Sequence, residues 1–169
     1  MSVDQKQMQT VLDGIEKGKR EGAKLLCGGE RLAGPAHEHG WFVAPTVFGG
    51  VKSSMSLGQE ELFGPVLAIL EAAGDDEALE IANSTRYGLT ASVYTRDLSR
   101  AQRFADGLEA GMIHVNNPTV GGEAQAPFGG TKATGVGARE MGRSAWEFYS
   151  EVKTVYVDTT GKPRTGNLY

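Results

Sequence analysis

The chain has 169 residues, of which 40% are hydrophobic and 22% are charged, as is usual for one globular domain with its own core. Its net charge of −4 argues against nucleic acid or an anionic membrane as the main partner. A single cysteine excludes an internal disulfide, and no apolar stretch reaches the ~18 residues of a membrane span or forms an N-terminal signal, so we expect a cytoplasmic protein.

The first third of the chain contains one helical pattern and two strand patterns. Apolar residues recur at helical spacing over residues 4–22, which predicts an amphipathic helix. Residues 24–27 are predicted to form a short strand that two glycines stop. After a polar loop, residues 41–48 are predicted to form a strand that contains an edge-type proline.

The middle of the chain alternates strands and helices. Residues 66–70 are continuously apolar, which is typical of a strand covered on both faces. Asp75 and Asp76 can cap a helix that runs through Ser84. A strand, a helix and a strand follow at 89–94, 98–108 and 112–115. This alternation predicts an α/β fold with a mainly parallel sheet.

A glycine-rich loop of about twenty residues follows Asn116, and loops of that length inside a domain are usually functional. A short helix at 143–149 closes the loop, and residues 154–157 are predicted to form a final strand. Because this strand follows an apparently complete domain, it is a candidate for pairing with another chain.

The stretch Glu60-Glu61-Leu62-Phe63-Gly64-Pro65-Val66 carries the strongest chemical signal. It places a carboxylate two positions before an aromatic ring and then fixes the backbone with a Gly-Pro step. A carboxylate can hold the two hydroxyls of a ribose, and a ring can lie against a flat heterocycle. This combination suits the nicotinamide end of a dinucleotide.

Six segments occur in an order that identifies a family resemblance. They are 22–29 (GAKLLCGG), 40–47 (GWFVAPTV), 60–66 (EELFGPV), 87–94 (YGLTASVY), 111–116 (GMIHVN) and 127–135 (PFGGTKATG), followed by 138–142 (AREMG). Together they resemble the C-terminal portion of an NAD(P)-dependent aldehyde dehydrogenase. Any one of them alone would be a weak signal, but all six in register are not expected by chance.

The resemblance implies a three-layer α/β catalytic domain with a mainly parallel sheet and flanking helices, plus an oligomerisation strand. On this basis residues 1–150 are part of the catalytic domain, and residues 151–169 are the oligomerisation strand and tail. Glu61 matches the position whose carboxylate binds the nicotinamide ribose of NAD or NADP, and Phe63 matches the position whose ring packs beside the nicotinamide. The loop that lines the aldehyde tunnel corresponds to Asn116, Asn117, Pro118, Thr119, Val120, Gly121 and Phe128.

The family's nucleophilic cysteine, its general base and its phosphate-binding turn all lie upstream of the matching segment, so the chain alone is not expected to oxidise aldehydes. The partner is then a second copy of the chain or a complementary N-terminal half, with an aldehyde as substrate of the complete enzyme. One alternative is a truncated or repurposed domain that acts as a non-catalytic self-association module. Another is an independent mononucleotide-binding domain.

Several other residues have simpler interpretations. Cys27 is expected to be a buried, inert thiol, because its local motif contains nothing placed to lower its pKa. The two histidines of 37–39 are expected to be solvated rather than to bind a metal. His114 alternates with apolar residues in a strand, so a hydrogen-bonded core histidine is expected. Arg139 and Glu140 are expected to tie down the glycine-rich loop through hydrogen bonds.

Overall fold

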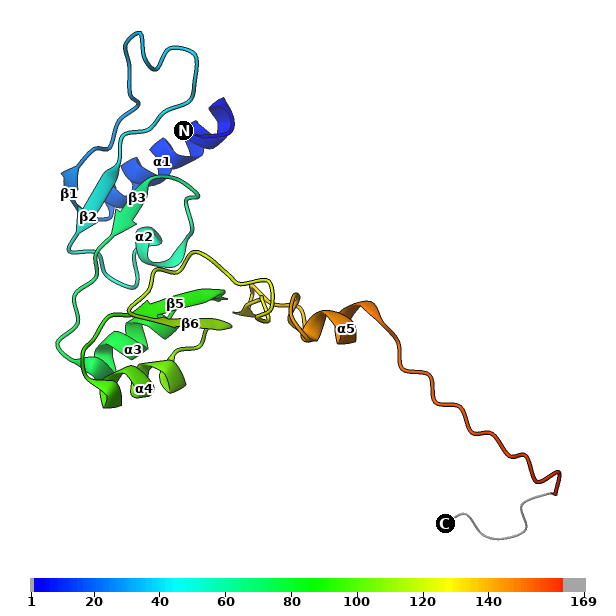
Figure 1. The fold of residues 1–169 in the computed structure, drawn as a ribbon. Helices are drawn as coiled ribbons and strands as arrows, with labels where there is room; N and C mark the ends of the chain where they lie inside the picture. The colour runs from blue at the N-terminus through cyan, green and yellow to red at the C-terminus, as the bar shows by residue number, and fades with distance from the viewer. Residues whose placement is uncertain (1, 163–169) are drawn as a thin grey trace.

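The computed structural model describes residues 2–162, which form two groups of elements (Figure 1). The first group contains α1 (Gln5–Arg20), β1 (Lys24–Cys27), β2 (Thr46–Gly49), α2 (Ser56–Gln59) and β3 (Val66–Ala68). The second contains α3 (Asp75–Asn83), β4 (Tyr87–Gly88), β5 (Thr90–Val93), α4 (Leu98–Gly107), β6 (Met112–Val115) and β7 (Thr131–Lys132). Helix α5 (Ser144–Tyr149) leads away from it. The α/β class is confirmed.

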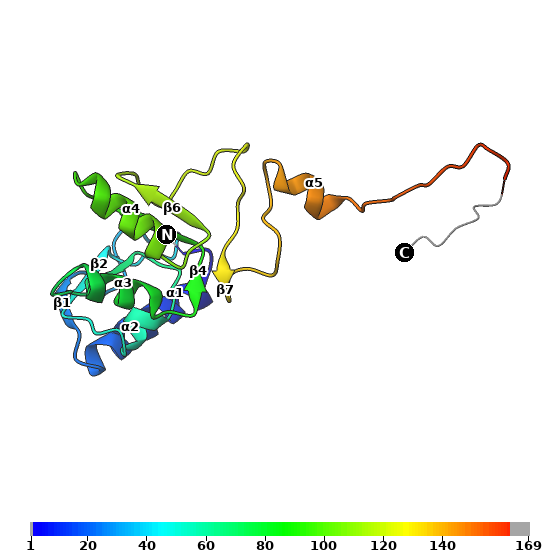
Figure 2. The same ribbon diagram turned by 90° about the horizontal axis from the view of Figure 1, so that it is seen from below.

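The strands pair in three small sheets rather than in one. In the first sheet β2 lies between β1, which is antiparallel to it, and β3, which is parallel. Strands β5 and β6 are parallel, and β4 and β7 are antiparallel neighbours (Figure 2). The prediction of one mainly parallel sheet is therefore wrong for residues 2–162. Parallel neighbours need a crossover connection. Helix α2 lies in the connection from β2 to β3, and α4 lies in the connection from β5 to β6. Only a loop joins β1 to β2, and these two strands are antiparallel.

Helix α1 forms the core by packing against one face of the β1–β2–β3 sheet. The Asp4 carboxylate accepts a hydrogen bond from the Gln7 backbone N–H at 2.7 Å and so caps the helix. Basic side chains in its last turn suit the negative end of the helix dipole. Its buried side chains meet the sheet in one cluster that contains Met8, Val11, Ile15, Ala23, Val43, Phe48 and Val51. The predicted helix at 4–22 is confirmed.

The predicted strand at 41–48 is only partly correct, because the regular strand begins at Thr46. Before it, Trp41 and Val43 form isolated bridges to Ser2 and Arg31. Pro45 has no N–H to donate to a ladder, so it interrupts regular pairing at this point. The strand at 24–27 agrees with β1 at both ends.

Strand β3 is not covered on both faces as its apolar run predicted. Leu67 is 58% exposed and Ile69 is 42% exposed, whereas their neighbours Val66 and Ala68 pack against the α1 core. Alternate side chains of a strand point to opposite faces, and α1 covers only one of them. The outer face of this sheet is therefore apolar and open to solvent within the described part of the chain.

Helices α3 and α4 are joined by ion pairs at their N-terminal ends. Gly74, not an aspartate, is the N-cap of α3, so the predicted capping role of Asp75 and Asp76 is wrong. The Asp75 carboxylate instead accepts hydrogen bonds from Arg100 Nε at 2.8 and 2.9 Å, and Asp76 pairs with Arg103. These hydrogen bonds from Arg100 lower the pKa of Asp75.

The C-terminal segment leaves the rest of the molecule. After α5 the backbone extends away (Figures 1 and 2), and residues 151–159 have no regular secondary structure. No described strand of this chain pairs with residues 154–157, and their predicted pairing with another chain stays a prediction. None of the helices within residues 2–162 combines the length and apolar character that crossing a membrane requires.

Candidate functional site

The loop after α2 borders a cavity of about 440 Å³. The loop reverses the chain between α2 and β3, so the Glu60–Gly64 stretch lies at one edge of the first sheet. The cavity is lined by Leu57, Glu60, Glu61, Leu62, Phe63, Gly64, Val66 and Ala68. The structure thus brings together the two residues, Glu61 and Phe63, that the sequence assigned to the nicotinamide end of a cofactor.

The two adjacent glutamates differ in their partners. Glu60 Oε2 accepts a hydrogen bond from Arg86 Nη2 at 3.0 Å and lies 3.4 Å from the Tyr87 hydroxyl. Hydrogen bonding to Tyr87 and the charge of Glu60 raise the pKa of Arg86, so the guanidinium stays charged. The Glu61 carboxylate has no hydrogen bond or ion pair with any described residue. Glu60 is therefore occupied by the protein, while Glu61 can accept hydrogen bonds from a ligand.

The Phe63 ring is likewise left largely uncovered by the rest of the described chain. Phe63 is 79% exposed, although phenylalanine is a large apolar residue. Its backbone has a φ of 52°, in the left-handed region that L-residues rarely adopt. An exposed ring beside a free carboxylate offers one apolar face and one acceptor group to a planar, hydroxylated ligand.

The predicted tunnel residues lie elsewhere, and within the described chain none of them lines the cavity beside Glu61. The Asn116 side chain holds the end of β5 in place: its Oδ1 accepts from Thr95 N and its Nδ2 donates to Thr95 O, both at 2.8 Å. The carbonyl of Asn117 accepts from the Ser92 hydroxyl at 2.6 Å. The exposed loop that follows contains Pro118, Thr119, Val120 and Gly121.

The glycine-rich loop is tied down from both ends. Phe128 pairs with Glu140 through two backbone hydrogen bonds of 2.6 and 2.8 Å, and Phe128 is 36% exposed. Arg139 Nη1 donates to the Gly130 carbonyl at 2.5 Å, which confirms its predicted role. Glu140 contributes through its backbone rather than through its carboxylate. The loop is thus a folded substructure.

Two predicted burials are wrong. Cys27 is exposed, and its Sγ lies 3.9 Å from the Pro45 carbonyl. His114 is half-buried, and its side chain has no hydrogen bond to a described residue, so it is not the hydrogen-bonded core histidine expected. His37 packs edge-on against Phe42 with the ring centroids 5.2 Å apart.

Sequence reasoning missed the residues of α1 that touch the Glu60–Gly64 loop. Gln7 Nε2 donates to the carbonyls of Leu62 at 2.9 Å and Phe63 at 3.3 Å. One signal was available, because Gly14 and Gly18 stand four residues apart inside a helix, where glycine is unfavourable. Glycines so placed indicate that another segment approaches the helix closely.

The family model described as "Aldehyde dehydrogenase family" matches residues 2–155. The chain belongs to this family. Over 151 residues it is 44% identical to an alpha-ketoglutaric semialdehyde dehydrogenase of Bacillus subtilis, covering 89% of this chain and 31% of that protein. Over 161 residues it is 50% identical to an aldehyde dehydrogenase of Enchytraeus buchholzi, covering 95% and 31%.

Solved structures agree with this assignment. An apo betaine aldehyde dehydrogenase of Staphylococcus aureus superposes with a TM-score of 0.90 at 32% identity, covering 99% of this chain and 32% of that one. A Mycobacterium tuberculosis aldehyde dehydrogenase complexed with NAD+ gives 0.85 at 36% identity, covering 95% and 32%. The chain therefore spans about a third of the length of the family members it matches.

Proposed function

We propose that the chain is the C-terminal part of an NAD(P)-dependent aldehyde dehydrogenase, an enzyme that oxidises an aldehyde to a carboxylic acid. The order of the six sequence segments supports the C-terminal placement, and the share of 31% supports a partial subunit. Residues 1–150 are then part of a three-layer catalytic domain that the rest of the subunit completes. Residues 151–169 are its assembly strand and tail.

The observation that carries the proposal is the free carboxylate of Glu61 beside the exposed ring of Phe63 on one cavity. Glu61 accepts hydrogen bonds from the two hydroxyls of the nicotinamide ribose, and these are strengthened by its charge. The Phe63 ring lies beside the nicotinamide and excludes water from that side. NAD or NADP, when bound, accepts the hydride that the aldehyde carbon loses.

The loop at 116–121 and Phe128 form one wall of the aldehyde tunnel in this proposal. Val120 is 73% exposed. Ligand sites are lined mainly by apolar side chains, so Val120 can line the tunnel when another part of the subunit forms the opposite wall. Asn116 positions the loop by its two hydrogen bonds to Thr95 rather than by contact with substrate.

The extent of exposed surface supports the need for a complementary part. The solvent-accessible surface is 12354 Å², whereas a compact monomer of this mass exposes about 8,000 Å². The extended C-terminal segment contributes part of this excess, and so does the apolar outer face of the first sheet, with Leu67 and Ile69. We infer that the N-terminal part of the subunit covers that face.

The test is activity with and without the complementary part. The purified chain alone is expected to give no aldehyde-dependent reduction of NAD or NADP, because Cys27 does not line the cavity with Glu61 and no other cysteine is present. Mixing it with a polypeptide that carries the upstream two thirds of a related aldehyde dehydrogenase is expected to produce activity. Enzyme-like turnover by the chain alone would contradict the proposal.

Exchange of Glu61 for glutamine isolates the cofactor contact in the reconstituted enzyme. Glu61→Gln is expected to raise the KM for NAD about 10-fold or more, because hydrogen bonds to a charged acceptor contribute ~1.5–3 kcal/mol. Glu60→Gln makes the same change in charge one residue away, where the carboxylate is paired with Arg86, and should leave the KM nearly unchanged. An equal rise in the KM for NAD in both variants would contradict a specific role of Glu61 in cofactor binding.

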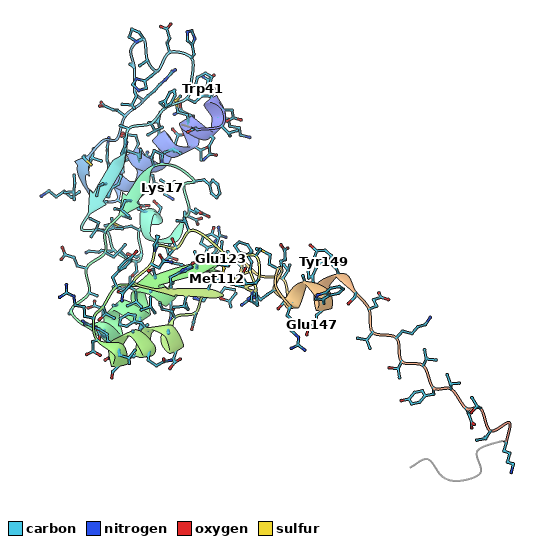
Figure 3. All side chains as sticks on the ribbon, viewed as in Figure 1. Lys17, Trp41, Met112, Glu123, Glu147 and Tyr149 are labelled. Atoms are coloured by element: carbon cyan, nitrogen blue, oxygen red, sulfur yellow. The ribbon has the colours of Figure 1, made fainter. Side chains whose placement is uncertain are left out.

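We further propose that the C-terminal segment joins two copies of the subunit. Figure 3 shows Glu147 and Tyr149 on α5, away from both groups of elements. Exposed apolar side chains continue along the segment, with Val152 96%, Val155 68%, Tyr156 86% and Val157 76% exposed. A chain that ends before residue 151 is expected to sediment as a smaller species than the full chain at equal concentration. Identical sedimentation would contradict this.

A further inference from the structure

The conformation of Phe63 needs an external support. Its φ of 52° is unfavourable for a residue with a side chain, and its ring is too exposed to be held by packing. The restraint must therefore act on the backbone of the loop. Since Glu61 precedes Phe63 by two residues, whatever holds this backbone also sets where the Glu61 carboxylate points.

Gln7 supplies that restraint. Its side-chain amide donates to two successive carbonyls, those of Leu62 and Phe63, at 2.9 and 3.3 Å. Gln7 itself is half-buried, and its own backbone N–H is held by the Asp4 cap. A rigid helix thus presents two donor hydrogens at the point where the loop adopts its left-handed turn.

The same face of α1 continues the contact along the loop. Gln7, Val11, Gly14 and Gly18 follow one another at spacings of four, three and four residues, which places them in one stripe. A side chain on Gly14 would overlap Leu62, and one on Gly18 would overlap Leu57. A Cβ on Gly64 would lie 2.6 Å from Val11 Cγ2. The large side chains of Leu57 and Leu62 therefore lie against glycines of α1, and Gly64 lies against the larger Val11.

The stripe ends at Glu21, directly after α1. Its carboxylate accepts hydrogen bonds from both the backbone N–H and the hydroxyl of Ser56, each at 2.7 Å. Ser56 begins α2, where an acceptor satisfies a backbone donor that the helix itself leaves unpaired. Helix α1 therefore holds the Ser56–Gly64 segment at both of its ends.

We propose that this stripe of α1 is the positioning element for Glu61 and Phe63, with Gln7 as the positioning residue that keeps Phe63 in its left-handed conformation. Gln7 acts through the loop backbone and touches neither of the two side chains that meet the ligand. The functional meaning of this inference rests on the proposed cofactor role of Glu61, but the conformational claim does not.

The test is a nuclear magnetic resonance measurement on the full chain without cofactor. The 13Cα and 13Cβ shifts of Phe63 report its backbone conformation. In Gln7→Met, which keeps the length of the side chain but removes both donors, these shifts are expected to lose their left-handed signature. Gln7→Glu, which also lacks a donor, should do the same, whereas Gln7→Lys retains a donor and should preserve the signature.

Gln5→Met is the matched control, because Gln5 is exposed at the start of the same helix and its side chain makes no hydrogen bond to a described residue. It should leave the Phe63 shifts unchanged. The resonances of the β1–β2–β3 core should stay unchanged in every variant. Retention of the left-handed signature in both Gln7→Met and Gln7→Glu would overturn the inference. Failure of the cofactor proposal is recognised separately, by an unchanged KM for NAD in Glu61→Gln.

Discussion

Phe48→Ala is expected to destabilise the chain by about 3–5 kcal/mol, the usual cost of truncating a fully buried aromatic residue. Phe48 is completely inaccessible to solvent and lies on the central strand of the first sheet. It belongs to the same buried cluster as Met8, Val11 and Ile15 of α1. Chemical denaturation followed by circular dichroism at 222 nm measures the change in the free energy of unfolding.

Phe63→Ala is the matched control for Phe48→Ala, since it removes the same ring from a site that is 79% exposed. It should change the free energy of unfolding by less than about 0.5 kcal/mol, as surface substitutions usually do. A similar loss of stability in both variants would mean that the core does not lie where the structure places it. A stable Phe63→Ala would also allow the cofactor role of the ring to be examined separately.

Gly111→Ala is expected to separate the glycine-rich loop from the second group of elements. An added Cβ would overlap the Gly129 carbonyl oxygen and approach Gly130 Cα to 3.0 Å. Both are backbone atoms, so no side-chain rotation relieves the overlap, and a cost of about 3 kcal/mol or more is expected. The β4–β7 pairing should be lost with it, because β7 follows directly after Gly130. Limited proteolysis within 117–143 should become faster.

Gly122→Ala provides the comparison within the same loop. An added Cβ there would meet only Phe128, at an ordinary contact distance of 3.7 Å. Proteolysis and the free energy of unfolding should therefore remain close to those of the unchanged chain. If Gly111→Ala behaved like Gly122→Ala, the close backbone approach between β6 and the loop would be refuted.

Local patterns were sufficient where a segment interacts mainly with itself or with one neighbour. The apolar spacing of α1 and the glycine stop after β1 located these elements to within two residues of their observed ends. The span of β6 at Met112–Val115 was also correct. Periodicity succeeds here because it records which side of a single element is apolar.

Long-range partners were not accessible in the same way. Asp75 looked like a helix cap, but it is occupied by Arg100, which lies 25 residues further on. The apolar run of β3 is typical of a strand buried on both faces, although only one face is covered within residues 2–162. In both cases the residue type indicates which interactions are possible. Which partner the residue actually meets depends on how the chain folds in three dimensions.

For the candidate site, the order of motifs was enough to predict the family, which the comparisons confirm, and to propose Glu61 and Phe63 as contacts of the nicotinamide end of a cofactor. The packed molecule added a physical difference between the two neighbours, because Arg86 pairs with Glu60 whereas Glu61 has no such partner among the described residues. Only the packed molecule identified Gln7, whose contact spans 55 residues of sequence. Hydrogen bonds between distant segments depend on three-dimensional proximity, and no local pattern of residue types encodes that proximity.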